Sequence, residues 1–167
     1  ALKMKAAGAD AVIMILYPKP AAVLIRDSLK IGNNPDWVGQ TAINDFAAFE
    51  KQVGVPNALA KFSTITGVAY QPTDPEMKDW ADRLKRLFPN DELSTFNMNG
   101  IGSGQVLVEA LERAGKDLTR DKFLAALGGI KNFEVDAYAG PITCDAPTSH
   151  QCNQTPGWLA LKNGKVV

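Results

Sequence analysis

Histidine and net charge are what this sequence has least of. His150 is the single histidine, and eighteen Lys and Arg residues balance eighteen Asp and Glu residues. A Ser-His-Asp or Cys-His catalytic arrangement would have to use His150, which lies in a polar turn, residues 146–151, without an apolar wall. The balanced charge leaves no electrostatic footprint for nucleic acid or an anionic membrane. The sequence therefore predicts a protein that is not an enzyme and does not bind nucleic acid.

Cysteine is also scarce, because Cys144 and Cys152 are the two in the chain. With Asp145 and His150 they could be imagined as zinc ligands, but the two thiols depart from the paired spacing of zinc sites. A disulfide between them needs only an oxidising compartment, and free thiols are the third interpretation. We favour the disulfide, and we expect no metal and no cofactor.

Long apolar runs are absent as well. No run approaches the roughly 20 residues that a helix needs to cross a bilayer. A hydrophobic share of 46% with 22% charged residues is ordinary for a soluble globular protein. The chain has no initiator Met and no signal-peptide pattern, so we interpret it as a mature or truncated piece of a longer protein.

The apolar run that is present, residues 11–16, follows a short helix end at Gly8 and precedes Tyr17 and two prolines. A bounded run of this kind is typical of a strand covered on both faces in a parallel sheet. Tyr17 then lies at the carboxyl end of that strand, where open α/β sheets bind their ligands. The alternative is that Tyr17 merely caps the core.

The first half of the chain alternates helix-like and strand-like segments. Residues 20–31 have the apolar spacing of a helix, and residues 37–42 form a short strand with its loop. Asn44 or Asp45 can cap the next helix, and the β-branched residues within 62–70 predict a third strand. This alternation predicts an α/β fold with a parallel sheet.

The character changes at residues 71–75, where two prolines make a stiff segment of the kind found between domains. Asp74 is a suitable cap for a helix over residues 75–88. The Gly-Ile-Gly-Ser-Gly run at 100–104 lacks the preceding strand and the final spacing of a dinucleotide loop, so close helix packing is favoured there. The remaining expected elements are a helix that ends at Gly115, a helix capped by Thr119, and short strands over 140–144 and 158–161.

Five segments, taken in order, carry a resemblance to a known family: AGADAVIMILYPKPAAVLIRDSLKIG, DPEMKDWADRLKRLFP, GQVLVEALERAGKDLTRDKFLAALGGIKNF, GPITCDAPTSHQ and GWLALKNGKVV. Together they resemble the later half of the periplasmic substrate-binding proteins of branched-chain amino-acid-type ABC transporters. The resemblance implies a type I periplasmic binding fold, in which two doubly wound α/β lobes hold a ligand in the cleft between them. It also implies a periplasmic or other extracytoplasmic location and an ABC permease as the membrane partner.

The same resemblance assigns parts of the chain to lobes. Residues 1–70 would belong to the second lobe, residues 71–143 to the first, and residues 155–167 would return to the second. Hinge crossings are expected near 71–72 and 143. The N-terminal half of the parent protein, which carries most of the groups that grip the ligand carboxylate in this family, is missing from this chain.

Four residues fall at or near ligand positions of the family: Tyr17, Gln40, Thr41 and Asn99. Tyr17 matches an aromatic residue at the cleft rim, and Thr41 stands where amino-acid binders hold an acidic residue that pairs with the ligand's ammonium. A neutral hydroxyl cannot supply that charge-assisted bond. The resemblance thus implies capture of a small carboxylate, and it favours an aromatic or other organic acid over a branched-chain amino acid. Ordinary loop and capping chemistry is the alternative for Gln40, Thr41 and Asn99, and a ligand sensor on the same fold is the alternative function.

Overall fold

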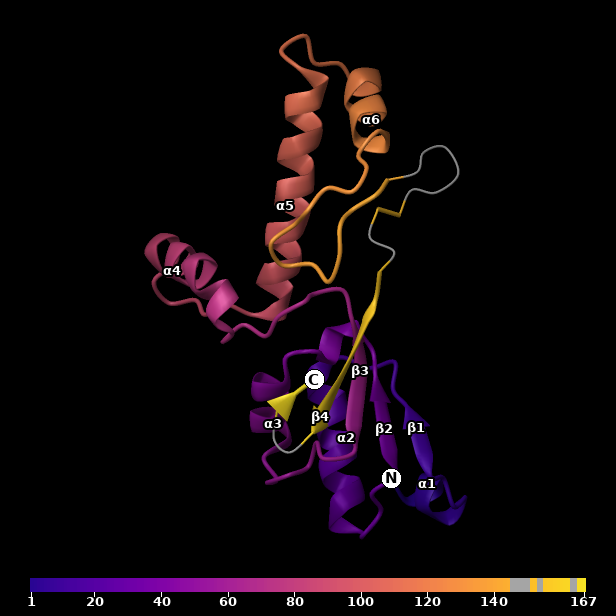
Figure 1. The fold of residues 1–167 in the computed structure, drawn as a ribbon. Helices are drawn as coiled ribbons and strands as arrows, with labels where there is room; N and C mark the ends of the chain where they lie inside the picture. Colours follow the sequence, from indigo (N-terminus) through magenta and orange to yellow (C-terminus); the bar gives the residue numbers. More distant parts are fainter. Residues whose placement is uncertain (145–150, 153–154, 163–164) are drawn as a thin grey trace. The chain divides into compact units, whose positions relative to one another are not determined.

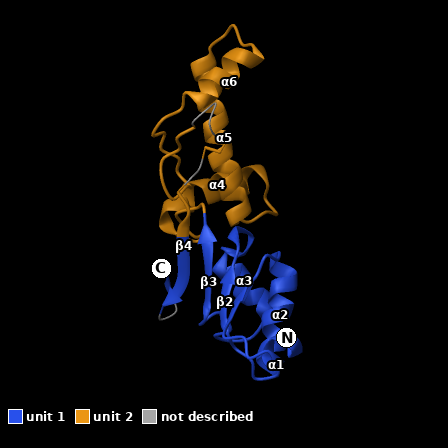
Figure 2. Ribbon diagram, turned by 90° about the vertical axis from the view of Figure 1, so that its right-hand side faces the viewer, with its two compact units in different colours: residues 1–66, 158–167 blue, residues 67–157 orange. Residues whose placement is uncertain are grey.

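The computed structural model describes residues 1–144, 151–152, 155–162 and 165–167. The chain divides into two compact units, drawn in different colours in Figure 2. Unit 1 holds residues 1–66 and 158–167, and unit 2 holds residues 67–157. The assignment of these units to the lobes of a larger protein stays a prediction.

Unit 1 is built on a five-stranded sheet with the order β1-β2-β3-β4-β5. β1 (Ala11–Ile13), β2 (Asp36–Gly39) and β3 (Phe62–Thr66) are parallel neighbours, and β4 (Gly157–Lys162) pairs antiparallel with β5 (Lys165–Val166). The helices are α1 (Leu2–Ala6), α2 (Pro18–Lys30), the 3-10 helix η1 (Thr41–Ile43) and α3 (Phe46–Val53), as labelled in Figure 1. The parallel strands and their connecting helices confirm the α/β prediction.

The helices of unit 1 begin and end at residues suited to those positions. Pro18 occupies the first position of α2, where its missing N–H has no intrahelical partner to lose. Asp45 caps α3, since its Oδ1 accepts a hydrogen bond from the Ala48 backbone N–H at 3.0 Å. Asp45 is therefore the cap, and Asn44 is not. α3 ends at Gly54, whose φ of 68° lies in the left-handed region that glycine adopts readily.

Aromatic side chains from β3 and α3 meet in the core of unit 1. The Phe62 ring packs edge-on against Phe46 and at a tilt against Phe49, with centroid distances of 5.5 and 5.2 Å. All three side chains are buried, together with the Ala21 and Ile25 side chains of α2. The core therefore joins one face of the sheet to both long helices.

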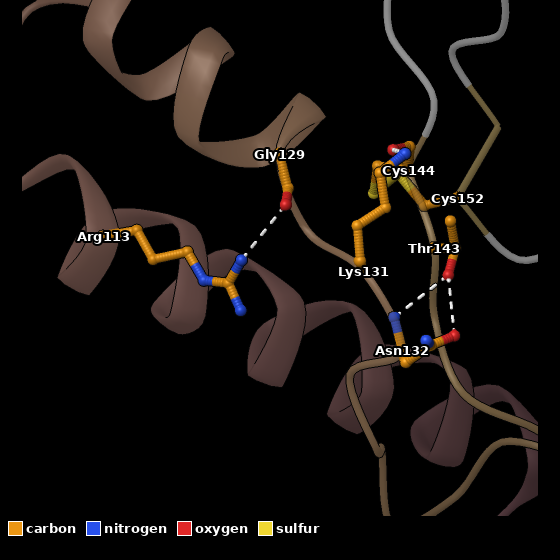
Figure 3. Close-up of a disulfide and its surroundings, with 7 residues drawn as sticks. All are labelled: Arg113, Gly129, Lys131, Asn132, Thr143, Cys144 and Cys152. Carbon is orange, nitrogen blue, oxygen red and sulfur yellow. Dashed lines mark hydrogen bonds between the residues drawn. A yellow bond between two sulfur atoms is a disulfide. The ribbon is translucent and has the colours of Figure 1, made fainter.

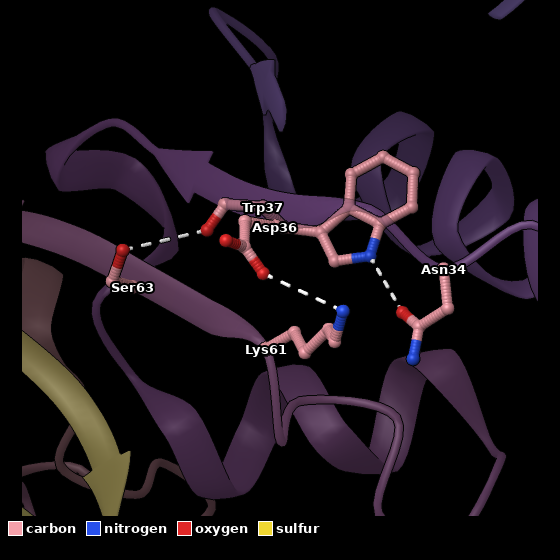
Figure 4. A network of polar contacts seen from close by, with 5 residues as sticks. All are labelled: Asn34, Asp36, Trp37, Lys61 and Ser63. Atoms are coloured by element: carbon pink, nitrogen blue, oxygen red, sulfur yellow. Dashed lines mark hydrogen bonds and ion pairs between the residues drawn. The ribbon is translucent and has the colours of Figure 1, made fainter. Parts of the chain in front are cut away.

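Polar contacts surround the buried Trp37 on β2 (Figure 4). The Trp37 Nε1 donates to Asn34 Oδ1 at 3.2 Å, and the Trp37 carbonyl accepts from Ser63 Oγ at 3.5 Å. Lys61 and Asp36 form an exposed ion pair at 3.7 Å, which contributes little to stability because water screens it. The indole N–H thus has a partner, as a buried donor requires.

The opposite face of the sheet carries apolar side chains that are exposed in this chain. Ile13 and Ile15 are 78% and 82% exposed, and Ile65 and Trp158 are 40% and 55% exposed. Met14, at the alternate position, is buried in the core. The prediction that residues 11–16 are covered on both faces is wrong for this chain, because the core cluster packs against only one face of the run.

Unit 2 is helical with irregular connections. Its elements are the 3-10 helix η2 (Pro75–Met77), α4 (Lys78–Leu87), α5 (Thr95–Ala114) and α6 (Arg120–Gly128), and α5 and α6 lie side by side in Figure 1. One buried cluster consists of Ala110, Ile130, Val135, Ile142 and Cys144, and a second consists of Val68, Met77, Met98 and Ala137.

Two strand predictions differ from the structure in this part of the chain. The third strand ends before the expected residue 70, because Val68 leaves the sheet and forms an isolated antiparallel bridge with Tyr138. Residues 140–144 form no strand, and Ile142 makes an isolated bridge with Phe133 instead. Both segments pair with other irregular segments through isolated bridges, which local composition does not reveal.

The predicted caps of unit 2 have different outcomes. Asp74 occupies the predicted N-cap position, directly before Pro75 of η2. Its side chain makes no capping hydrogen bond, because its Oδ2 accepts from the Gln71 backbone N–H at 2.7 Å instead. Thr119 caps α6 as predicted, since its Oγ1 accepts from the Lys122 backbone N–H at 3.2 Å. The Pro-rich segment therefore forms a turn over residues 71–74, in which the Asp74 backbone N–H also donates to the Gln71 carbonyl at 3.0 Å.

Cys144 and Cys152 form a disulfide, with their Cα atoms 4.2 Å apart (Figure 3). Cys144 is buried, its backbone N–H donates to the Ile130 carbonyl at 2.9 Å, and its carbonyl accepts from Lys131 Nζ at 2.9 Å. The favoured interpretation of the two cysteines is confirmed, and neither thiol is left to bind a metal.

Reduction of this disulfide is expected to lower the free energy of unfolding by about 2.5 kcal/mol, since the bridge restricts the unfolded chain across a separation of 8 residues. Urea denaturation with and without reductant measures the difference. The double variant Cys144→Ala/Cys152→Ala is the control, and reductant should not move its midpoint. An unchanged midpoint for the wild-type protein would contradict the expectation.

Candidate functional site

Three parallel strands of unit 1 end at the same edge of the sheet. Tyr17 follows the apolar run that contains β1, and Gln40 and Thr41 directly follow β2. We call Tyr17, Gln40 and Thr41 the carboxyl-edge residues. The Gln40 Nε2 donates to the Leu16 carbonyl at 3.1 Å, so the loops after β1 and β2 are in direct contact. The structure therefore brings these three predicted residues to one edge, the place where α/β sheets bind ligands.

Tyr17 is the large exposed side chain of this edge. It is 69% exposed and is the residue immediately before α2, with an extended backbone. Tyr17 does not belong to the core cluster of unit 1 or to the residues packed against it. An exposed phenol offers an apolar ring and a polar hydroxyl to a ligand.

Gln40 is held at both its side chain and its backbone. Besides the bond from Nε2 to Leu16, its carbonyl accepts a hydrogen bond from Thr64 Oγ1 at 2.8 Å. Thr64 is buried on β3, and no local pattern distinguishes it from the other β-branched residues of that strand. Gln40 is therefore a fixed polar group at the edge.

Thr41 is exposed and begins η1. Asp45, the carboxylate nearest to it in sequence, is engaged as the cap of α3. Asn44 is buried, and its Nδ2 donates to Thr66 Oγ1 at the end of β3, at 3.1 Å. The loop from Gln40 to Asn44 thus presents neutral side chains.

Asn99, the fourth predicted residue, lies in unit 2 on α5. Its Nδ2 donates to the Thr95 carbonyl at 2.8 Å, and its carbonyl accepts from Tyr138 Oη at 3.1 Å. Ser103 Oγ is 3.2 Å from the same hydroxyl. Tyr138 therefore fixes the turn of α5 that carries Asn99, a role that the sequence did not indicate because the two residues are far apart in the chain.

Gly102 leaves room for the Tyr138 ring against α5, because a Cβ at this position would lie 2.4 Å from Tyr138 Cζ. Gly102→Ala is therefore expected to lower the free energy of unfolding by about 1–3 kcal/mol, measured by urea denaturation. Gly100→Ala is the matched control, since its Cβ would meet nothing within 4 Å, and it should be neutral or stabilising by roughly 0.5–1 kcal/mol. Equal effects of the two variants would contradict this packing. The finding supports the sequence-based choice of close packing over a phosphate loop.

No group of three or more His, Cys, Asp and Glu side chains suited to a metal ion occurs among the described residues. His150 and Asp145, considered as possible zinc ligands, lie outside that part of the chain. Within the same ranges, no helix has both the length and the apolar character needed to span a bilayer.

Solved structures with a similar fold include three from bacteria. A branched-chain amino acid ABC transporter protein from Thermus thermophilus with bound valine has a TM-score of 0.82 at 19% identity, covering 99% of this chain and 46% of that one. A fatty acid ABC transporter substrate-binding protein from Thermomonospora curvata has a TM-score of 0.77 at 22% identity, covering 99% and 43%. A possible leucine/isoleucine/valine-binding protein from Rhodopirellula baltica has a TM-score of 0.75 at 21% identity, covering 95% and 42%. This chain thus spans less than half the length of each of these three structures.

A comparison with proteins of curated function found no match. The family model described as periplasmic binding protein matches residues 1–162. This match and the shared fold confirm the resemblance read from the sequence, and the family is one of binding proteins rather than enzymes. Because the matched region includes almost the whole chain, the chain belongs to the periplasmic binding protein family.

Proposed function

We propose that this chain is the C-terminal part of the extracytoplasmic solute-binding component of an ABC importer. The full-length protein captures a small carboxylate ligand in the cleft between two lobes and delivers it to a membrane permease. Family membership and the transport proteins among its structural neighbours support this role. A two-lobed binding protein of this kind encloses its ligand when the two rigid lobes close on a hinge.

The observation that carries the choice of ligand is the neutral character of the carboxyl-edge residues. Tyr17 offers an exposed ring, Gln40 and Thr41 are uncharged, and the nearby Asp45 carboxylate is engaged as a helix cap. An α-ammonium group would lose its hydration here without a charge-assisted partner. The ligand is therefore an aromatic or other organic acid rather than a branched-chain amino acid.

The N-terminal half of the same protein is the proposed partner of the exposed sheet face. Ile13, Ile15, Ile65 and Trp158 form an apolar face whose exposure is costly in water. The matched structures are more than twice as long as this chain, so additional polypeptide exists in them. The missing half covers this face and supplies the groups that grip the ligand carboxylate.

A thermal-shift screen of the full-length protein, stripped of bound ligand, tests the proposed function. A ligand present at 100 times its dissociation constant stabilises the folded state by about 2.7 kcal/mol, which raises the melting temperature measurably. We expect such shifts from small aromatic or aliphatic carboxylates. The absence of a shift from every carboxylate and every amino acid in the screen would contradict the proposed function.

A further inference from the structure

Gln40 is fixed before any ligand arrives. Its side-chain Nε2 donates to Leu16 at 3.1 Å, and its backbone carbonyl accepts from Thr64 at 2.8 Å. The preceding Gly39 lies tightly against the Phe62 ring, because a Cβ on Gly39 would be 2.7 Å from Phe62 Cζ. A polar group held in this way loses little conformational entropy when it binds a ligand.

The orientation of the Gln40 amide follows from these contacts. The nitrogen end of the amide is turned to the Leu16 carbonyl, so the oxygen end faces away from that carbonyl. Among the described residues Oε1 accepts no hydrogen bond, and it is not a buried atom, so solvent reaches it. The hydroxyls of Tyr17 and Thr41 can donate or accept, whereas an amide oxygen only accepts. The edge therefore contains a fixed acceptor that is open to solvent and has no donor from the described part of the protein.

We propose that Gln40 Oε1 accepts a hydrogen bond from a hydroxyl group of the ligand, at the end remote from its carboxylate. The inference rests on the proposed function and narrows the ligand class to hydroxy-substituted carboxylic acids. A second carboxylate at that end is disfavoured, because its oxygens are acceptors and would face Oε1 without a proton between them. The exposed Tyr17 ring supplies apolar contact for the body of such a ligand.

Calorimetric titration of the full-length protein with three matched acids tests this inference. 3-(4-Hydroxyphenyl)propanoate can donate, 3-phenylpropanoate lacks the group, and 3-(4-methoxyphenyl)propanoate can accept but not donate. We expect the hydroxy acid to bind about fivefold more tightly than the phenyl acid, and the methoxy acid to bind no more tightly than the phenyl acid. The methoxy acid also tests the second N–H of Gln40 Nε2, which could only meet an acceptor.

The outcomes separate the two proposals. Equal binding of the hydroxy and phenyl acids, or a methoxy acid that matches the hydroxy acid, overturns the role of Oε1 and leaves the proposed function standing. If no carboxylate binds in this titration or in the thermal screen, the proposed function fails, and this inference fails with it.

Substitutions test which residue causes the preference for the hydroxy acid. Gln40→Met removes the acceptor while keeping the length of the side chain, and it should reduce the preference for the hydroxy acid to about onefold. Gln52→Met, on the exposed surface of α3, is the matched control and should keep the preference. A preference that survives in Gln40→Met, or is lost in Thr41→Val alone, overturns the assignment to Gln40. If Gln40→Met does not fold, the three-acid comparison on the wild-type protein still decides.

Discussion

Replacing Phe62 with alanine is expected to lower the free energy of unfolding of unit 1 by about 3–5 kcal/mol. Phe62 is buried between the Phe46 and Phe49 rings and also covers Gly39. Because glycine has no side chain to move into the space, the cavity in Phe62→Ala stays largely unfilled. Hydrogen exchange at the amides of β1 to β3, together with urea denaturation, measures the loss where it occurs.

Two control variants test whether the loss of stability comes from the missing core volume and not from any substitution in β3. Phe62→Leu keeps most of the apolar volume and should cost clearly less than Phe62→Ala. Ser63→Ala, at the next position on the opposite face of β3, removes one long hydrogen bond to the Trp37 carbonyl (3.5 Å) and should lower the free energy of unfolding by no more than about 1 kcal/mol. A loss for Phe62→Ala no larger than that for Ser63→Ala would show that this cluster is not the core of the unit.

The second large effect is expected from Thr41→Glu, measured on ligand affinity. Thr41 is exposed at the carboxyl edge, so a glutamate can be accommodated there. Its carboxylate would supply the charge-assisted partner for an α-ammonium group that the wild-type edge lacks. We expect the affinity of the full-length protein for leucine to rise about tenfold or more relative to 4-methylpentanoate, the same carbon skeleton without the amino group.

Thr41→Gln is the matched control for charge, because glutamine has nearly the shape of glutamate. The relative affinity for leucine should stay at the wild-type level in Thr41→Gln. A similar rise in both variants would mean that size or hydrogen bonding matters and that charge does not. No rise in Thr41→Glu would mean that the ligand's amino position is not near residue 41.

The first half of the fold could be predicted because its signals are local. The apolar run before Tyr17, the proline at the start of α2, the Asp45 cap and Gly54 each act within a few residues. The second half was predicted less well, because long-range contacts decide it. Val68 continues a β-branched run but pairs with Tyr138, so the strand ends early.

In the candidate site, too, some features follow from local sequence patterns and others depend on long-range contacts. The placement of Tyr17 and Gln40 at one edge follows from strand order, which the sequence pattern predicts. The direction of the Gln40 amide depends on the Leu16 carbonyl, 24 residues away in the chain, and no local rule predicts it. Nor could the sequence indicate that Tyr138 would hold the turn that carries Asn99.

The exposure of one sheet face in unit 1 also could not be predicted from a local pattern. The isoleucines of this face were expected to be covered, because a continuous apolar run is typical of a strand buried on both sides. In this chain the core packs against one face only, and Ile13 and Ile15 are more than three-quarters exposed, at 78% and 82%. The run thus suits a longer protein, in agreement with the length of the matched structures.

The measurement that tests the central claim most directly is a calorimetric titration of the ligand-stripped, full-length protein with two matched pairs. The pairs are leucine with 4-methylpentanoate and phenylalanine with 3-phenylpropanoate, which differ only in the α-amino group. The neutral carboxyl edge predicts that the acid without the amino group binds more tightly in at least one pair and that neither amino acid binds tightly. Tight binding of leucine or phenylalanine would contradict the account, because another residue, with Asp45 the first candidate, would then supply the missing charge.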